Sequence, residues 1–380
     1  MCIRDRGWLV RDLTDSFASS GLLVVTVGGM TTLPTLIVGP WAGVLGDRVD
    51  RRKLVIVVQS FMAFAAIIFA LLVSSGHVEW WHAYIYVIIS GVCWSTTLTI
   101  RQTLVANTVP KEALVNAYAS NTLTITGTRM IGPFIGGVLI TTVGFSWNFA
   151  IEAGLYAATV LAFLPMKTPY TQQRREKSSR SPLANFMEGI QYVRKEERVI
   201  WNLLLLGLIP NVLLHPAWFV LPVFTVEVLH RSADVGGVLL AVTGLGGLVS
   251  ALTIASVGFG TSRGMICLGS ILLASISVLL FAHSPWLVPA AILIGLMSLA
   301  QATFRTSSST LIQSLVPDHL RSRITSLHLY SQGFVFMSSL AVGLLVDITN
   351  VVIALTAVGA AGLVLGSISY LILPRVRQAR

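Results

Sequence analysis

Long apolar runs separated by short polar breaks dominate the pattern along this chain. A helix needs about 20 mostly apolar residues to cross the hydrocarbon core of a bilayer. Eleven runs are expected as spanning helices, at about residues 19–42, 54–75, 82–105, 114–143, 146–165, 199–225, 234–258, 264–283, 285–313, 323–347 and 350–373. Turn and loop residues mark the breaks at Asp47–Arg52, Ser74–Gly76, Val109–Lys111, Gly144, Ser284–Pro285, Val316–Asp318 and Thr349–Asn350. The pattern predicts an all-helical membrane protein.

Composition excludes a soluble globular domain. Only 11% of the 380 residues are charged and 54% are hydrophobic, whereas soluble domains carry about 25% charged residues. The net charge of +10 at first suggests a nucleic-acid partner. In a membrane protein, an excess of basic residues in cytoplasmic loops explains that charge better. We therefore expect the lipid bilayer, and no nucleic acid, among the partners.

The distribution of Lys and Arg predicts the orientation in the membrane. If the charged stretch Gly43–Lys53 is cytoplasmic and the spans alternate, 19 of the 26 basic residues are cytoplasmic and four are outside. This bias follows the positive-inside rule. It predicts a multi-pass protein of the plasma (inner) membrane, with a cytoplasmic central linker and a cytoplasmic C-terminus.

The stretch Gly43–Lys53 reads GVLGDRVDRRK and lies between two apolar runs. Its pattern, Gly-x-Leu-x-Asp-Arg-x-x-Arg-Arg, resembles the loop between the second and third helices of major facilitator superfamily transporters. Many members have Gly in place of Asp50, although a Phe/Val-Asp-Arg-Arg variant is familiar among drug and siderophore exporters. The equivalent of Asp47 caps a helix of the second half in that family. The resemblance implies a conformational latch formed by Gly43, Asp47, Arg48, Arg51 and Arg52.

The same resemblance implies a major facilitator fold, in which two six-helix bundles form a pseudo-twofold repeat. Eleven spans then leave the first helix largely missing. Met1–Arg6 looks like a translated cloning or sequencing scar, and Gly7–Ser16 resembles the end of a first helix and the start of its outer loop. The alternatives are a genuine eleven-helix protein and a fragment that is inactive because its bundle is open to lipid.

An internal repeat supports two halves. Thr103–Leu114 resembles Thr310–Leu320, with the Val-Pro pairs 207 residues apart, and repeated halves are typical of transporters. The polar linker Met166–Ser181 leads into Pro182–Arg198, which has the pattern of an amphipathic helix on anionic headgroups or of a solvated linker. The expected domains are residues 1–16 (scar and remnant of helix 1), 17–165 (helices 2–6), 166–198 (basic cytoplasmic linker) and 199–380 (helices 7–12).

Ionisable residues within the spans are candidates for function because they are costly in a bilayer. Arg101 shares a helix face with Trp94 and resembles the basic motif of the fourth helix, whose Arg points into the central cavity in the superfamily. The alternative is an Arg that snorkels to the cytoplasmic headgroups. Arg305, with Gln301 one turn before it, is the candidate counterpart in the second half.

Arg129 is a further candidate residue of the substrate cavity. It precedes Gly132-Pro133-x-x-Gly136-Gly137, which resembles a fifth-helix motif of exporters in the superfamily. Proline removes a backbone hydrogen bond and bends a helix, and glycines allow helices to approach closely. Together they predict a bend that seals the cavity against leakage. Ordinary packing of small residues is the alternative.

Glu152 is the candidate proton-coupling residue. An apolar environment favours the protonated form of a carboxyl group, so Glu152 has the chemistry to take up and release a proton during a transport cycle. No landmark of the superfamily falls at this position. The alternative is a permanently protonated or outward-snorkelling side chain.

The run 199–225 contains Pro210, Pro216 and Pro222. Three prolines predict a kinked or broken helix, which is tolerated in a membrane where it lines a cavity. Polar and aromatic side chains on one face of this run are candidates for substrate contact: Asn211, His215 and Trp218. For His215 the alternative is a structural hydrogen bond.

No metal-ligand spacing and no phosphate-binding loop is visible in the sequence. We therefore expect no metal, no cofactor and no enzymatic activity, and a monomer. The predicted function is secondary active export of a small amphipathic molecule, of siderophore or drug type, by alternating access with proton antiport. The alternatives are an uptake carrier or lysolipid flippase of the same fold, and a non-transporting membrane sensor.

Overall fold

The computed structural model describes residues 5–14, 20–38, 50–110, 113–166, 191, 193–194, 198–257, 263–315 and 331–378. Every regular element in these ranges is helical, as the hydropathy pattern predicts. Seven of the described helices are long and apolar enough to cross a membrane, and α14 is a shorter apolar helix. The multi-span class is therefore confirmed, while the number of eleven spans stays a prediction.

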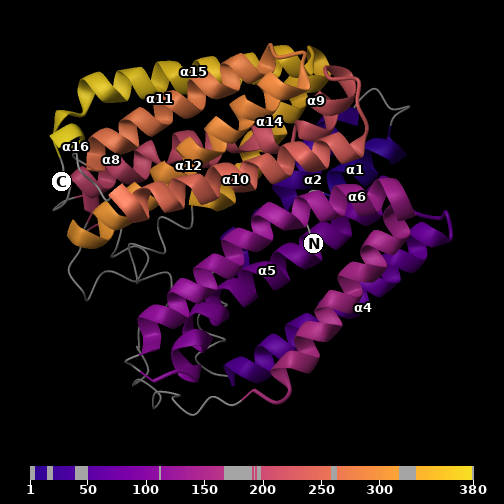
Figure 1. The fold of residues 1–380 in the computed structure, drawn as a ribbon. Coiled ribbons are helices and arrows are strands. Elements are labelled where there is room, and N and C mark those ends of the chain that lie inside the picture. The colour runs from indigo at the N-terminus through magenta and orange to yellow at the C-terminus, as the bar shows by residue number, and fades with distance from the viewer. Residues whose placement is uncertain are drawn as a thin grey trace.

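The helices fall into an N-terminal and a C-terminal bundle (Figure 1). The N-terminal bundle contains α1 (Asp5–Leu13), α2 (Ser20–Met30), α4 (Arg51–Ser74), α5 (Trp80–Thr108) and α6 (Leu114–Phe163). The C-terminal bundle contains α8 (Arg198–Leu206), α9 (Leu221–Glu227), α10 (Ala233–Val257), α11 (Arg263–Ala282), α12 (Leu287–Leu315), α14 (Val335–Ile348), α15 (Val351–Ile372) and α16 (Pro374–Gln378).

Local sequence signals explain where several helices begin and turn. Asp50 caps the N-terminus of α4, because its carboxylate accepts from the backbone N–H groups of Arg52 and Lys53. Asn350 caps α15 in the same way, through the N–H of Ile353. Within α6, only Gly144 departs from helical geometry, with φ 84° and ψ 172°. This conformation is essentially restricted to glycine, so one residue forms the turn between the two predicted spans.

The seventh predicted span is broken as its prolines suggest. After α8, residues Ile209–Leu213 form a π-helical turn and His215–Trp218 form a 3-10 turn. Pro216 has no N–H to donate to the carbonyl of Val212, one turn earlier. The hydroxyl of Ser338 on α14 donates to that carbonyl instead, at 2.7 Å. A neighbouring helix thus satisfies the backbone group that proline leaves without a donor.

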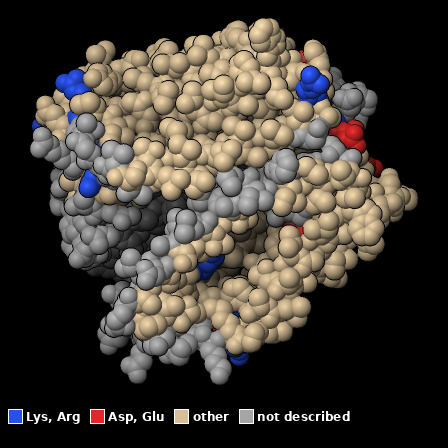
Figure 2. All heavy atoms as spheres, viewed as in Figure 1, with Lys and Arg blue, Asp and Glu red and all other residues tan. Residues whose placement is uncertain are grey.

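The two bundles contact each other mainly through the pairs α6–α10 and α2–α14. We call the end that carries Arg51, Arg263 and Arg375 the basic end, and the end that carries Glu79 and Glu227 the opposite end. The bundles lie close together near α1, α2 and α9, at the opposite end, and diverge towards α16 (Figure 1). Figure 2 shows a hollow in the surface between them on the side of the basic end.

Candidate functional site

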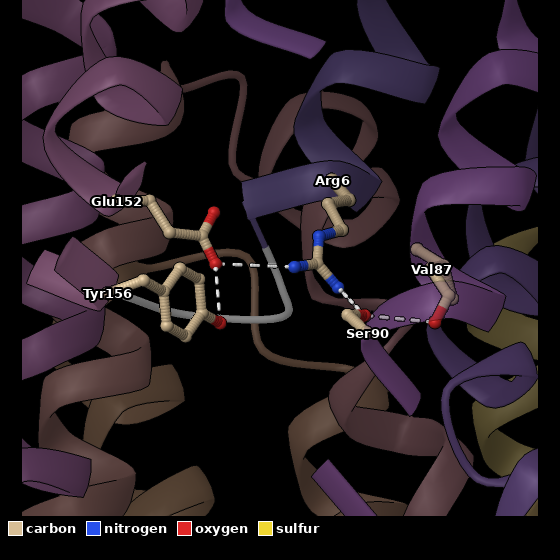
Figure 3. Close-up of polar contacts among 5 residues, drawn as sticks. All are labelled: Arg6, Val87, Ser90, Glu152 and Tyr156. Atoms are coloured by element: carbon tan, nitrogen blue, oxygen red, sulfur yellow. Dashed lines mark hydrogen bonds and ion pairs between the residues drawn. The ribbon is translucent and has the colours of Figure 1, made fainter. Parts of the chain in front are cut away.

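A charged pair lies inside the N-terminal bundle, where α1 meets α5 and α6 (Figure 3). The guanidinium of Arg6 lies 3.3 Å from a carboxylate oxygen of Glu152, and the two residues are only 1% and 4% exposed. Arg6 also donates to the hydroxyl of Ser90 at 2.6 Å. The hydroxyl of Tyr156 donates to the same oxygen of Glu152 at 3.2 Å. Four side chains from three helices therefore form one buried polar cluster.

Aromatic rings close one side of this cluster. The guanidinium of Arg6 lies over the ring of Tyr86, 4.4 Å from its centroid, which adds a cation–π contact. Tyr86 stacks on Phe69 at 4.6 Å, and Phe149 meets both rings edge-on. These rings cover one side of the cluster, and a less polar surrounding strengthens the hydrogen bonds and the ion pair within it.

The cluster combines a carboxylate, a guanidinium and two hydroxyl groups. The cost of burying two charges is offset by their mutual attraction only while both charges are present. Loss of one charge leaves the other buried and uncompensated. Each charge therefore depends on the other to stay buried where α1 packs against α6. Arg6 lies in Met1–Arg6, which the sequence predicts to be a cloning or sequencing scar. The other residues of the cluster lie outside that segment: Glu152, Tyr156, Tyr86 and Ser90.

A second group of predicted residues lies in the C-terminal bundle. Asn211 and Gln301 are each 5% exposed. Within the described part of the chain, the side-chain nitrogens of both lack a hydrogen-bond partner. Both residues fall near the middle of their spans, and the turn that contains Asn211 contacts α12. Buried donors without partners are costly, so these two amides remain candidates for contact with a polar molecule.

The aromatic residues of the seventh span gather beside Asn211. The ring of His215 stacks with that of Trp218 at 6.1 Å and meets Phe219 edge-on at 5.5 Å. Two other predicted cavity residues lie elsewhere along the chain. Arg305 is partly buried on α12, and Trp94 is 47% exposed on α5. The structure brings His215 and Trp218 together, and it places Trp94 in the other bundle.

Arg101 is tied to a neighbouring helix. Its guanidinium donates twice to the side-chain oxygen of Asn121 on α6, at 3.0 and 2.6 Å. The residue is partly buried. These two hydrogen bonds hold the guanidinium of Arg101 between α5 and α6 in the N-terminal bundle.

The predicted latch is described only in part. Gly43, Asp47 and Arg48 lie outside the described residues. Arg51 is partly buried in the first turn of α4. Arg52 donates from Nε to the carbonyl of Phe163 at 2.9 Å and from Nη2 to the carbonyl of Leu164, so it caps the C-terminal end of α6. In this structure Arg52 therefore contacts its own bundle.

The glycine–proline motif lies in the first half of α6. The backbone is helical throughout the motif, because Gly144 is the only residue of α6 with non-helical angles. Gly136 is buried, and Gly132 has open space where a Cβ would be. The side-chain surroundings of Arg129, Pro133 and Gly137 lie outside the described part of the structure.

Several residues of the site were not predicted from sequence. Tyr86, Ser90 and Tyr156 look like ordinary span residues, because tyrosine and serine are common in apolar helices. Asp347 falls at the last position of a predicted run and was not singled out. A carboxylate at the end of an apolar run was the available signal for it.

Two bundles of membrane-spanning helices that meet along two helix pairs, with charged and amide groups buried inside, are typical of secondary transporters. The model of the transmembrane secretion effector family matches residues 4–379. The chain therefore belongs to this family, within the major facilitator superfamily. That confirms the predicted family and agrees with the expectation that the chain is not an enzyme.

Characterised relatives are transporters of siderophores by name. The chain is 27% identical over 381 residues to the enterobactin exporter EntS of Escherichia coli O1:K1, covering 98% of this chain and 87% of the relative. It is 23% identical over 346 residues to the staphyloferrin A transporter of Staphylococcus aureus, covering 90% of this chain and 85% of the relative.

Solved structures confirm the fold. A POT family transporter superposes with a TM-score of 0.77 at 12% identity, over 98% of this chain and 93% of that one. A D-xylose–proton symporter superposes with a TM-score of 0.70 at 13% identity, over 99% and 98%. At these identities the likeness shows the fold alone, which is the predicted major facilitator fold.

Proposed function

We propose that this transporter exports a small amphipathic molecule, of siderophore or drug type, from the cytoplasm by alternating access coupled to proton antiport. The family and the names of its relatives support a siderophore-like substrate. The basic end is the cytoplasmic end in this proposal, because Lys and Arg are enriched on that side. The observation that carries proton coupling is the buried carboxylate of Glu152, with Tyr156 as its hydrogen-bond donor.

The proposed cycle assigns a role to each group of residues. Glu152 takes a proton when its site is open to the outside and releases it to the cytoplasm. Asn211, Gln301 and the His215–Trp218 pair contact the substrate near the middle of the membrane, with Arg305 near them. A few polar side chains in an otherwise apolar site suit an amphipathic molecule.

The remaining predicted residues have conformational roles in this proposal. Asp47, with Gly43, Arg48 and Arg51, latches the cytoplasmic end when it closes. The element that starts at Arg129 and ends at Gly137 seals the cavity. The central linker joins the halves on the cytoplasmic side.

Transport into inverted membrane vesicles tests the proposal. Vesicles that contain the protein are given labelled catecholate siderophores, lipophilic cations or antibiotics, with and without an imposed proton gradient. The gradient should drive accumulation of at least one compound. Glu152→Gln should abolish the gradient-dependent part, whereas Asp12→Asn, which changes an exposed carboxylate on α1, should leave it unchanged.

Other outcomes point to the rival functions. Accumulation in the opposite direction would indicate an uptake carrier, and movement of labelled lysolipid alone would indicate a flippase. If the correctly inserted protein moves none of the compounds under either condition, secondary export is contradicted and a sensor becomes the better explanation.

A further inference from the structure

A carboxylate of one bundle caps a helix of the other at the opposite end of the molecule. Asp347 lies in the last turn of α14, in the C-terminal bundle. Its Oδ1 accepts from the backbone N–H of Leu22, in the first turn of α2, at 2.9 Å. The first N–H groups of a helix have no partner within it and carry partial positive charge. An anionic side chain at this position therefore satisfies them well.

The backbones around this contact are packed closely. A Cβ on Gly343 of α14 would lie 3.1 Å from the Cα of Leu22, and a Cβ on Gly21 would lie 2.6 Å from Cγ1 of Val346. Glycines on both helices thus allow α2 and α14 to approach with little side-chain separation. The hydrogen bond of Asp347 depends on this approach, because a carboxylate must lie within about 3 Å of an N–H group to accept from it.

A second polar contact joins the bundles at the same end. Arg11 of α1 lies 3.5 Å from the carboxylate of Glu227 at the end of α9, and it also donates to the hydroxyl of Ser20 at 3.1 Å. Glu227 is exposed, so this ion pair is weaker than a buried one. Both contacts cross from one bundle to the other, and both lie where Figure 1 shows the bundles close together.

We propose that Asp347 is a latch that holds the opposite end closed by capping α2, and that this contact breaks each time that end opens. The inference rests on the proposed alternating-access function, in which the bundles rock about the substrate site. In that motion the contacts at one end must separate when that end opens. The proposed orientation places this latch on the outer side, away from the Gly43–Lys53 loop.

The size of the effect follows from the chemistry of the contact. A charged group on helix N–H donors stabilises its state enough to change an equilibrium by about tenfold. Asp347→Asn keeps an oxygen of the same shape and removes the charge. This substitution should therefore raise the ratio of outward-open to outward-closed molecules by about tenfold.

Distances between spin labels, measured by pulsed electron paramagnetic resonance, test the latch without any substrate. One pair replaces His77 and His283, which are exposed at the opposite end of the two bundles. A second pair replaces Lys53 and Gln378, which are exposed at the basic end. The background carries serine or alanine at Cys2, Cys93 and Cys267, the three cysteines of the chain.

In Asp347→Asn the outer pair should move towards its longer distance while the inner pair moves towards its shorter one. Asp12→Asn removes an exposed carboxylate from the same end and should shift neither pair. Asp347→Ser keeps a hydroxyl acceptor without charge and should shift both pairs in the same directions. This milder variant carries the test if thermal melting shows that Asp347→Asn does not fold.

Unchanged distance distributions in folded Asp347→Asn and Asp347→Ser would overturn the latch. A change at the outer pair alone would also overturn it, because a local loosening of α2 does not move the inner end. The failure of every compound in the vesicle assay would leave these distances readable. The latch and the proposed export function can therefore fail separately.

Discussion

At the scale of the residue, Glu152 and Arg6 are the most constrained charges in the described part of the molecule. Each is almost fully buried, each relies on the other and on a hydroxyl group, and Arg6 also lies over the ring of Tyr86. Burying two charges costs several kcal/mol per ion, and their attraction offsets this only in good geometry. Removing one charge should therefore cost more than removing both.

The pair is tested by a double-mutant comparison of stability. Glu152→Gln should lower the free energy of unfolding by about 3 kcal/mol, because Arg6 is left buried without its counter-charge. The double variant Arg6→Gln with Glu152→Gln should recover most of that loss. Thermal melting in one detergent measures both, with Asp12→Asn as the exposed control. Equal stability of Glu152→Gln and the unaltered chain would show that the pair contributes little.

The sequence identified Glu152 but not what surrounds it. A carboxylate in an apolar run is visible from composition alone, because its cost in a membrane is intrinsic to the residue. Its partners come from α1 and α5, far from it along the chain, and no helical periodicity specifies which faces meet. The role of Asp347 is not visible in the sequence for a related reason. Its partner is a backbone N–H group, and every residue except proline has one.

At the scale of the element, the helix α6 turns through a single residue. Gly144 has a positive φ of 84° and nothing within 4 Å of the position where a Cβ would be. A side chain at position 144 would therefore be disfavoured by backbone strain and not by steric crowding. The sequence predicted this break and most helix ends from hydropathy, turn residues and prolines, since those signals are local. The π-helical turn at Ile209–Leu213 and its hydrogen bond from α14 needed the three-dimensional contacts.

Alanine substitution separates strain from helix propensity in α6. Gly144→Ala should destabilise the protein by about 1–3 kcal/mol, because an L-residue with this φ and ψ is strained. Gly154→Ala is the matched control in the same element, where the glycine also has open space around it and the backbone is helical. It should be neutral or stabilising by up to about 1 kcal/mol. Thermal melting of the two variants in the same detergent measures the difference, and equal melting temperatures would contradict a strained turn at Gly144.

At the scale of the whole molecule, two bundles share contacts at the opposite end and diverge towards the basic end (Figure 1). Such an arrangement is one of the two states that alternating access requires, with the hollow of Figure 2 on the proposed cytoplasmic side. The two-bundle plan was predicted from a repeated motif and a family resemblance. Which end is closed was not predictable, because in the proposed alternating access the same sequence forms both states.

A crosslink across the closed end should stop transport. A Cβ on Gly21 would lie 3.4 Å from the Cβ of Val346, close to the separation of about 3.8 Å found in disulfides. The double variant Gly21→Cys with Val346→Cys should therefore crosslink on oxidation and lose substrate movement, and a reducing agent should restore it. The reduced double variant is the control, because a Cβ at position 21 would lie 2.7 Å from Oδ1 of Asp347 and would disturb that contact even without a crosslink. Full transport by the fully crosslinked protein would exclude opening between α2 and α14.

The one-residue turn of α6 also bears on how the chain enters the membrane. Its two arms have no polar segment between them that the insertion machinery would carry across the bilayer. We therefore expect the arms to partition into lipid together, as a helical hairpin, and not one after the other. In that case the helical segments on both sides of Gly144 insert into the membrane in one step. An inserted polar tag at this position would turn one insertion event into two.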